Sequence, residues 1–255
     1  MQFSTRYILL FSTALCLISS SMLSIAAVGL RDRQELNKVL DKKKSVLQAC
    51  RLMKPTDRFS AEEVEAIFQN IEPKVLDLTT GTYAEGVDPK IFDPAKAPIA
   101  PAPKNSAQIM NMATQVLVYH VMKEGQLDML VLPIYGKGLW GTLYGYMAVD
   151  ADATTVEGIT YYDHKETPGL GGEVDNSRWK GLWPGRKVFD EAGQVALKVT
   201  KGPAGPVDQD PHRVDGLSGA TITSRGVTNM LQFWFGPNGY GPYLEQFRKN
   251  GSVQS

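Results

Sequence analysis

The sequence predicts an α+β protein: an N-terminal transmembrane helix followed by a mainly antiparallel sheet flanked by helices. Three observations lead to this fold class. Residues 7–30 carry no charge, the middle of the chain holds several short segments rich in β-branched and aromatic residues, and helical patterns lie at both ends. We expect a short tail (1–6), an anchor (7–30) and one soluble domain with an N-terminal helical extension (31–255).

The uncharged segment at residues 7–30 is 24 residues long. As a helix it would reach ~36 Å, enough to cross a hydrocarbon core of roughly 30 Å. Two alternatives are a buried core helix and a signal peptide. For a signal peptide, Ser24-Ile25-Ala26 fits the small-residue pattern of a cleavage site. The length of the segment and the single Arg6 before it favour an uncleaved single-pass anchor.

The charges around the anchor give no clear orientation. Only Arg6 precedes the segment, whereas six basic residues follow it: Arg31, Arg33, Lys38, Lys42, Lys43 and Lys44. The positive-inside rule would therefore place the domain in the cytoplasm, but this rule weakens for long translocated domains. The domain here exceeds 200 residues.

After the anchor, the apolar spacing of residues 31–53 predicts that the helix continues. A capping box that begins at Ser60 predicts a second helix as far as Phe68, and residues 74–78 form a predicted strand. Four prolines in residues 93–104 predict an extended, polyproline-like crossing. This crossing is also a possible domain boundary, but the flanking pieces look too small to stand alone.

The centre of the chain predicts most of the sheet. Alternating apolar residues indicate strands at 116–122 and 127–135, joined by a turn at 123–126, and two more strands at 145–150 and 156–163. Between these pairs, three glycines in residues 135–141 are expected to interrupt the sheet. Residues 188–201 predict a further hairpin around Glu191-Ala192-Gly193.

Residues 215–225 place four hydroxyl side chains and two glycines directly before an apolar helical run at 227–235. Gly216 and Gly219 allow positive φ and close backbone approach. A serine or threonine just before such a run predicts a helix N-cap, and the positive end of that helix would favour a phosphate. An ordinary turn and cap is the simpler alternative.

The hexapeptide that begins at Ser218 resembles the flavinylation motif S-G-A-T-x-T, with Asp215 at the family's usual acidic position. The whole chain resembles the NqrC subunit of the sodium-translocating NADH:quinone reductase, a family whose members contain an FMN-binding domain. In that family a flavin transferase esterifies FMN, through its phosphate, to the last threonine, which is Thr223 here. Ser218, Gly219, Ala220 and Thr221 would orient the motif or bind phosphate oxygens.

The resemblance implies more than the cofactor. It predicts an electron-transfer subunit, inactive alone, that works with five others in a complex passing electrons from NADH to quinone and pumping sodium. It also implies that the complex lies in the bacterial inner membrane, with the bulk of this subunit facing the periplasm.

Two further segments resemble parts of the same family. Residues 164–172 resemble the signature H-x-E-T-P-G-L-G, which includes Glu166. The alternative without a function is a Pro-Gly surface turn. We expect the backbone amides of Gly169 and Gly171 to approach the polar edge of the flavin, Leu170 to lie against the ring, and Thr167 to hydrogen-bond it.

The other segment, residues 135–140, contains two candidate flavin neighbours. Lys137 would neutralise the flavin phosphate or an anionic reduced ring, and Trp140 would lie beside the flavin. The alternative is a β-turn with Trp140 packed in the core.

Composition excludes several function classes. Lys plus Arg equals Asp plus Glu at 27 each, so the chain has no excess of positive charge that would indicate a nucleic-acid partner. Two cysteines and three dispersed histidines form no metal or iron–sulfur pattern, and no P-loop or G-x-G-x-x-G follows a strand. Two alternatives stay open: the homologous flavin subunit of an Rnf-type ferredoxin:NAD oxidoreductase, and a flavin-free, membrane-anchored assembly or binding domain.

Overall fold

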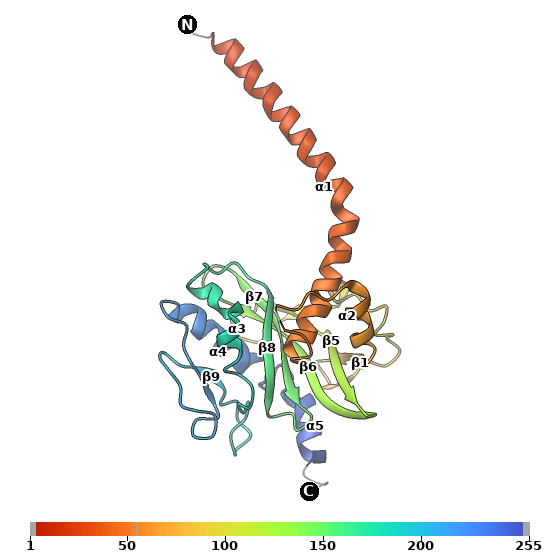
Figure 1. Ribbon diagram of the computed structural model, residues 1–255, viewed down its shortest axis with the longest axis vertical. Helices are drawn as coiled ribbons and strands as arrows, with labels where there is room; N and C mark the ends of the chain where they lie inside the picture. Colours follow the sequence, from red (N-terminus) through yellow and green to blue (C-terminus); the bar gives the residue numbers. More distant parts are fainter. Residues whose placement is uncertain (1–3, 55, 252–255) are drawn as a thin grey trace. The chain divides into compact units, whose positions relative to one another are not determined.

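The structure is a computed structural model that describes residues 4–54 and 56–251 (Figure 1). The chain separates into two compact units, Met1–Lys42 and Lys43–Ser255. Helix α1 (Thr5–Ala49) begins in the first unit and ends in the second. The predicted division of the chain at residues 6 and 30 stays a prediction.

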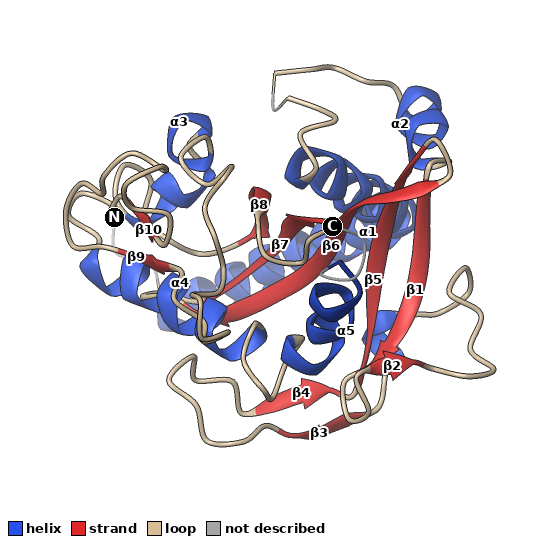
Figure 2. Ribbon diagram, turned by 90° about the horizontal axis from the view of Figure 1, so that it is seen from below, coloured by secondary structure: helices blue, strands red, loops and turns tan. Residues whose placement is uncertain are grey.

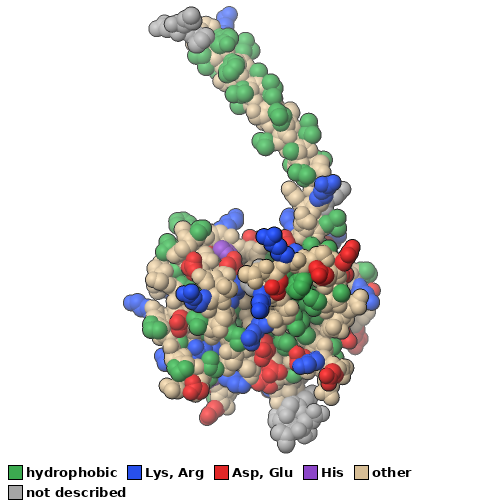
Figure 3. All heavy atoms as spheres, viewed as in Figure 1, with side chains coloured by type: hydrophobic (Ala, Val, Ile, Leu, Met, Phe, Trp, Pro, Cys, Tyr) green, Lys and Arg blue, Asp and Glu red, His purple; other side chains and the backbone are tan. Residues whose placement is uncertain are grey.

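The first unit contains the apolar part of α1. Residues Thr5–Arg31 have a mean hydropathy of 2.0, and none of the most apolar window is buried, so this helix is long and apolar enough to cross a membrane. Figure 3 shows hydrophobic side chains along this part of the helix. The predicted helix over residues 7–30 is confirmed, and it fits a single-pass membrane anchor.

The end of α1 belongs to the second unit. The helix ends at Ala49, earlier than the predicted residue 53, and Arg51 takes a left-handed conformation with φ 59°. The amide of Leu52 then donates to the carbonyl of Leu47 (2.9 Å), which closes the helix in a Schellman-like turn. Val46 and Leu47 are fully buried in the domain.

A six-stranded antiparallel sheet forms the centre of the second unit, in the order β2-β1-β5-β6-β7-β8 (Figures 1 and 2). Its strands are β1 (Ile71–Asp77), β2 (Thr82–Tyr83), β5 (Gln115–Lys123), β6 (Gln126–Lys137), β7 (Thr142–Asp150) and β8 (Val156–Asp163). The central strands fall where the alternation of apolar residues predicts them. The α+β fold class is confirmed.

Turn chemistry explains the joint between β5 and β6. Glu124 and Gly125 both have positive φ (53° and 79°), the combination that a two-residue type I′ turn requires. At the other end of β6 the prediction was wrong. The sheet is not interrupted at Tyr135, because β6 stays paired with β7 as far as Lys137 and Thr142, and the break begins at Gly138.

Two other predictions need correction. The polyproline-like crossing at residues 93–104 instead contains a short 3-10 helix, η1 (Pro94–Lys96), and a strand, β3 (Ile99–Pro101), paired with β4 (Asn111–Ala113). The hairpin at 188–201 is reduced to one bridge between Phe189 and Val195. The chain beyond it, β9 (Lys198–Val199), pairs in parallel with the distant β10 (Arg213–Val214).

Helices complete the domain. Helix α2 (Ala61–Phe68) begins with the predicted Ser60–Glu63 capping box, and η2 (Gly171–Asp175) and α3 (Ser177–Lys180) follow β8. Near the C-terminus lie α4 (Thr221–Trp234) and α5 (Gly241–Gly251).

Helix α4 packs closely against β6. A Cβ atom on Gly136 would lie 2.8 Å from Cβ of Met230, and a Cβ on Gly226 would overlap the carbonyl oxygen of Lys137. Val227, Met230 and Leu231 of α4 are fully buried. This contact between two glycine-bearing segments brings the start of α4 beside the end of β6.

Candidate functional site

The first turn of α4 has no side-chain cap. The N-cap residue is Ala220, so the predicted serine or threonine cap was wrong. Two hydroxyls of the motif face inward instead: Ser224 Oγ accepts from the amide of Leu217 (3.0 Å), and Thr223 Oγ1 donates to Glu166 Oε2 (2.5 Å). The first turn also contains no acidic residue. The amides at this helix start are therefore suited to an anion.

The two threonines of the motif differ sharply in exposure. Thr221 is exposed, whereas Thr223 is 0% exposed. Both lie inside α4, where two residues correspond to a rotation of about 200°, so the two side chains point to nearly opposite faces.

Glu166 joins three segments that are distant in sequence. Glu166 is buried, with only 5% of the residue exposed. Oε1 accepts from the amides of Leu139 and Trp140 (2.9 Å each), while Oε2 accepts from Thr223. The structure therefore brings the loop after β6, the loop after β8 and the start of α4 together, as the sequence predicts for the last two.

Glycines make room for this carboxylate. A Cβ on Gly171 would lie 2.6 Å from Thr223 Oγ1 and would overlap Glu166 Oε2, and a Cβ on Gly138 would lie 2.6 Å from Glu166 Oε1. Gly169 differs, because it has φ 77° and open space around its Cα. Packing therefore explains Gly171, whereas backbone conformation explains Gly169.

Exposed apolar side chains surround the start of α4. They come from the three segments that Glu166 joins, and their exposures are 41% for Leu139, 64% for Trp140, 45% for Leu170 and 46% for Ile222. Leu170 also reaches across to α4, because its Cδ2 lies 2.8 Å from the position of a Cβ on Gly219. The alternative that packs Trp140 in the core was wrong.

The remaining predicted residues occupy less central positions. Asp215 orders the preceding loop, because its Oδ1 accepts from the amide of Ala204 (2.8 Å) and its carbonyl accepts from Trp179 Nε1 (2.9 Å). Ser218 and Gly219 are exposed in the turn before α4. The carbonyl of Thr167 accepts from two amides of its own loop. Lys137 is the half-buried last residue of β6.

Comparisons with known proteins match the region that contains this site. The FMN-binding domain family matches residues 138–236. The NqrC subunit of the Na(+)-translocating NADH-quinone reductase from Yersinia pestis is 46% identical, covering 95% of this chain and 94% of the relative. The same subunit from Pseudomonas aeruginosa is 43% identical, covering 97% and 98%. The chain belongs to the NqrC family of Na(+)-translocating NADH-quinone reductase subunits. This membership favours the predicted sodium-pump family over the Rnf-type alternative.

Solved structures of the same family share the fold. The crystal structure of NqrC from Shewanella oneidensis has a TM-score of 0.74 at 36% identity, covering 84% of this chain and 99% of that one. The NqrC subunit from Parabacteroides distasonis gives a TM-score of 0.64 at 30% identity, covering 84% and 96%.

Sequence reasoning missed one residue of this NqrC-family site. His164 lies between Asp175 Oδ2, 2.8 Å from its Nε2, and the amide of Glu166, 3.2 Å from its Nδ1. It thereby fixes the backbone that carries Glu166, and no sequence signal links it to Asp175.

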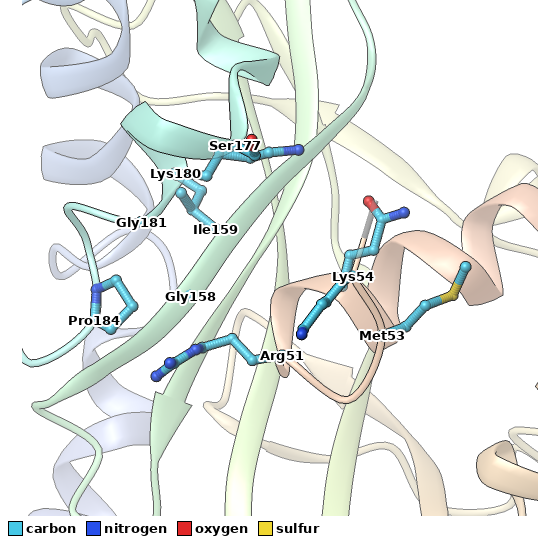
Figure 4. Close-up of a pocket in the computed structure, with 10 residues that line it drawn as sticks. Arg51, Met53, Lys54, Gly158, Ile159, Ser177, Lys180, Gly181 and Pro184 are labelled. Carbon is cyan, nitrogen blue, oxygen red and sulfur yellow. The ribbon is translucent and has the colours of Figure 1, made fainter. Parts of the chain in front are cut away.

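A separate pocket of about 240 Å³ lies where the end of α1 meets β8 and α3 (Figure 4). Three of its lining residues are basic: Arg51, Lys54 and Lys180. Burial lowers the pKa of Lys180, although the Asp175 carboxylate opposes this shift. The threonine motif does not line this pocket. Across residues 4–54 and 56–251, no cluster of three or more His, Cys, Asp or Glu side chains is arranged to hold a metal.

Proposed function

We propose that this protein carries FMN esterified at the start of α4 and relays electrons as a membrane-anchored subunit of a Na(+)-translocating NADH-quinone reductase. One observation carries the proposal. Three segments within the residues matched by the FMN-binding domain family, 138–236, meet at the uncapped start of α4, beside exposed apolar side chains. FMN supplies the electron transfer, and the protein holds the cofactor and tunes its potential.

The proposed attachment point is Thr223, the last threonine of the motif, as the sequence resemblance implies. In the unmodified chain its hydroxyl is buried and donates to Glu166 Oε2, whereas Thr221 is exposed at the first residue of α4. A phosphate on Thr223 would replace this hydrogen bond, and repulsion between its charge and the Glu166 carboxylate would move the two groups apart. The positive end of the helix would favour the phosphate at this position in the first turn.

The flavin ring would find apolar surface close to the start of α4. Leu170 and Ile222 flank the start of α4, and Leu139 and Trp140 come from the loop that Glu166 holds in place. Stacking on Trp140 or packing against Leu170 would remove apolar area from water. In this proposal Glu166 holds the three segments of this surface together beside the attachment point.

The wider assignments come from the family resemblance. The Thr5–Arg31 helix would anchor the protein in the bacterial inner membrane, with the soluble domain in the periplasm. The protein would work in a complex of six subunits and would receive FMN from a flavin transferase. An ester bond would make loss of the cofactor negligible where free FMN is scarce.

Visible absorption of the purified full-length protein tests the proposal, provided that the protein is produced together with the flavin transferase. The flavin bands should stay with the protein after denaturation, because the bond is covalent. Changing Leu170 to Ala should shift the spectrum or the potential while attachment persists, and Ala at exposed Ile91 serves as a control. Colourless denatured protein would favour the flavin-free assembly domain.

A further inference from the structure

The pocket at the end of α1 shares no residue with the proposed flavin site and is lined by basic side chains (Figure 4). Among the described residues that line it, Arg51, Lys54 and Lys180 are basic and none is acidic. Arg51 and Lys54 come from the turn after α1, whereas Lys180 comes from α3. The volume of about 240 Å³ lies below the roughly 300–1,000 Å³ of pockets for drug-sized ligands, so this pocket suits a smaller molecule.

Lys180 is the most enclosed of these three cations. Only 13% of its side chain is exposed, and its ion pair with Asp175 spans 3.9 Å. The same carboxylate contacts His164 Nε2 at 2.8 Å, so Lys180 shares its partner. Withdrawing an ammonium group from water is costly unless a close anion compensates its charge. An anion in the pocket would therefore stabilise the charge of Lys180.

Arg51 occupies a backbone position that favours glycine. Its φ is 59°, and it lies just after α1, where the left-handed residue that closes a helix is usually glycine. An arginine brings no advantage to the turn itself, because its Cβ is crowded in this conformation. Gly158 of β8 makes room for the turn, since a Cβ there would overlap the carbonyl oxygen of Ala49 and lie 3.6 Å from Arg51 Cγ. This strained position favours a role for the guanidinium in the pocket.

The charges on this turn have little compensation. Neither Arg51 nor Lys54 forms an ion pair within residues 4–54 and 56–251. The charge of Arg51 acts on Glu157, where it opposes the burial that raises the pKa of this carboxyl group. Glu157 does not line the pocket. Together with Lys180, the two side chains concentrate positive charge in a small volume, which attracts an anion.

We propose that this pocket binds a small phosphate-bearing anion through Arg51, Lys54 and Lys180. A phosphate monoester carries a charge of about −1.5 to −2 at pH 7, so it compensates several cations at once. The fork of the guanidinium matches two phosphate oxygens, and each ammonium group acts as a point charge. Gln48 adds a neutral donor: its Oε1 accepts from Thr160 (3.4 Å), which leaves its amide group to donate into the pocket.

Isothermal titration calorimetry with inorganic phosphate tests this inference on the full-length protein in a neutral detergent, made without the flavin transferase. We expect saturable binding of one phosphate per chain. Arg51→Gly should weaken binding about tenfold or more, since hydrogen bonds to charged groups contribute at least this factor. The fold should stay intact, because the positive φ suits glycine. Lys180→Gln should weaken binding to a similar extent, and Lys198→Gln, at an exposed position outside the pocket, is the control.

Absence of saturable binding up to about 1 mM phosphate would overturn the inference. Equal affinities of the two pocket variants and the Lys198 control would also overturn it. The same titration in lipid nanodiscs identifies the source of the phosphate group. Weaker binding of free phosphate in phosphatidylglycerol than in phosphatidylcholine would assign the pocket to a lipid head group, whereas equal binding in both would assign it to a soluble phosphate compound.

Discussion

Replacing Glu166 tests whether one carboxylate holds the three segments of the site together. Glu166→Ala removes the acceptor of three hydrogen bonds. The buried Thr223 hydroxyl, left without an acceptor, costs about 1–3 kcal/mol, and each partly exposed amide about 0.5–1 kcal/mol. The free energy of unfolding should therefore fall by about 2–5 kcal/mol.

Glu166→Gln should lower the free energy of unfolding much less, by about 1 kcal/mol. Its amide oxygen still accepts from the backbone of Leu139 and Trp140, and its amide group donates to Thr223 Oγ1. Glu191→Ala, at an exposed position, is the control and should change stability by about 0.5 kcal/mol or less.

Urea unfolding of the full-length protein in detergent, followed by tryptophan fluorescence, measures these differences. Trp183 and Trp234 are fully buried and report on the domain. Equal stability of the Ala variant and the Glu191 control would refute the reasoning. So would equal losses for the Ala and Gln variants, because the Gln side chain keeps the hydrogen bonds.

Three further predictions follow from other parts of the structure. Gly171→Ala should lower the free energy of unfolding by about 3 kcal/mol, because the added Cβ overlaps the Glu166 carboxylate. Gly169→Ala should lower it by about 1 kcal/mol, because Gly169 has a positive φ. Equal losses for the two variants in urea unfolding would contradict this. Burial lowers the pKa of His120 to about 4, so the unfolded chain, with a histidine pKa near ~6.5, takes up a proton that the folded chain does not. Stability should therefore fall as the pH drops from about 6.5 to 4, and His120→Gln should flatten this slope; parallel slopes would argue against it. The mature protein should keep residues 1–30 and stay in membranes after carbonate extraction, whereas an N-terminus near Ala27 would show that a signal peptide is removed.

Local chemistry accounts for the parts of the fold that the sequence predicts well. The Ser60 capping box and the positive-φ turn at Glu124-Gly125 depend on neighbouring residues alone, and both form where expected. The pairing of β9 with β10 joins residues 15 positions apart in parallel register, as Lys198 with Arg213. No turn signal marks such a contact, so residues 188–201 were predicted as a simple hairpin.

The candidate site shows the same limit. Its three segments are recognisable from their motifs, but the exposure of each hydroxyl depends on contacts across the fold. Thr223 is buried, and Glu166, 57 positions earlier, accepts its hydrogen bond. Spacing within the motif predicts that Thr221 and Thr223 face different ways, without indicating which one faces solvent.

Localising FMN on the peptide of residues 214–225 tests the central claim most directly. Trypsin releases this peptide, since Arg213 precedes it and Arg225 ends it, and fragmentation mass spectrometry assigns the FMN mass to one hydroxyl. We predict FMN on Thr223, and its loss from Thr223→Val, which keeps the shape of the side chain without the hydroxyl. FMN on Thr221 or Ser224 in the native protein, or a Thr223→Val variant that still carries covalent flavin, would contradict the account.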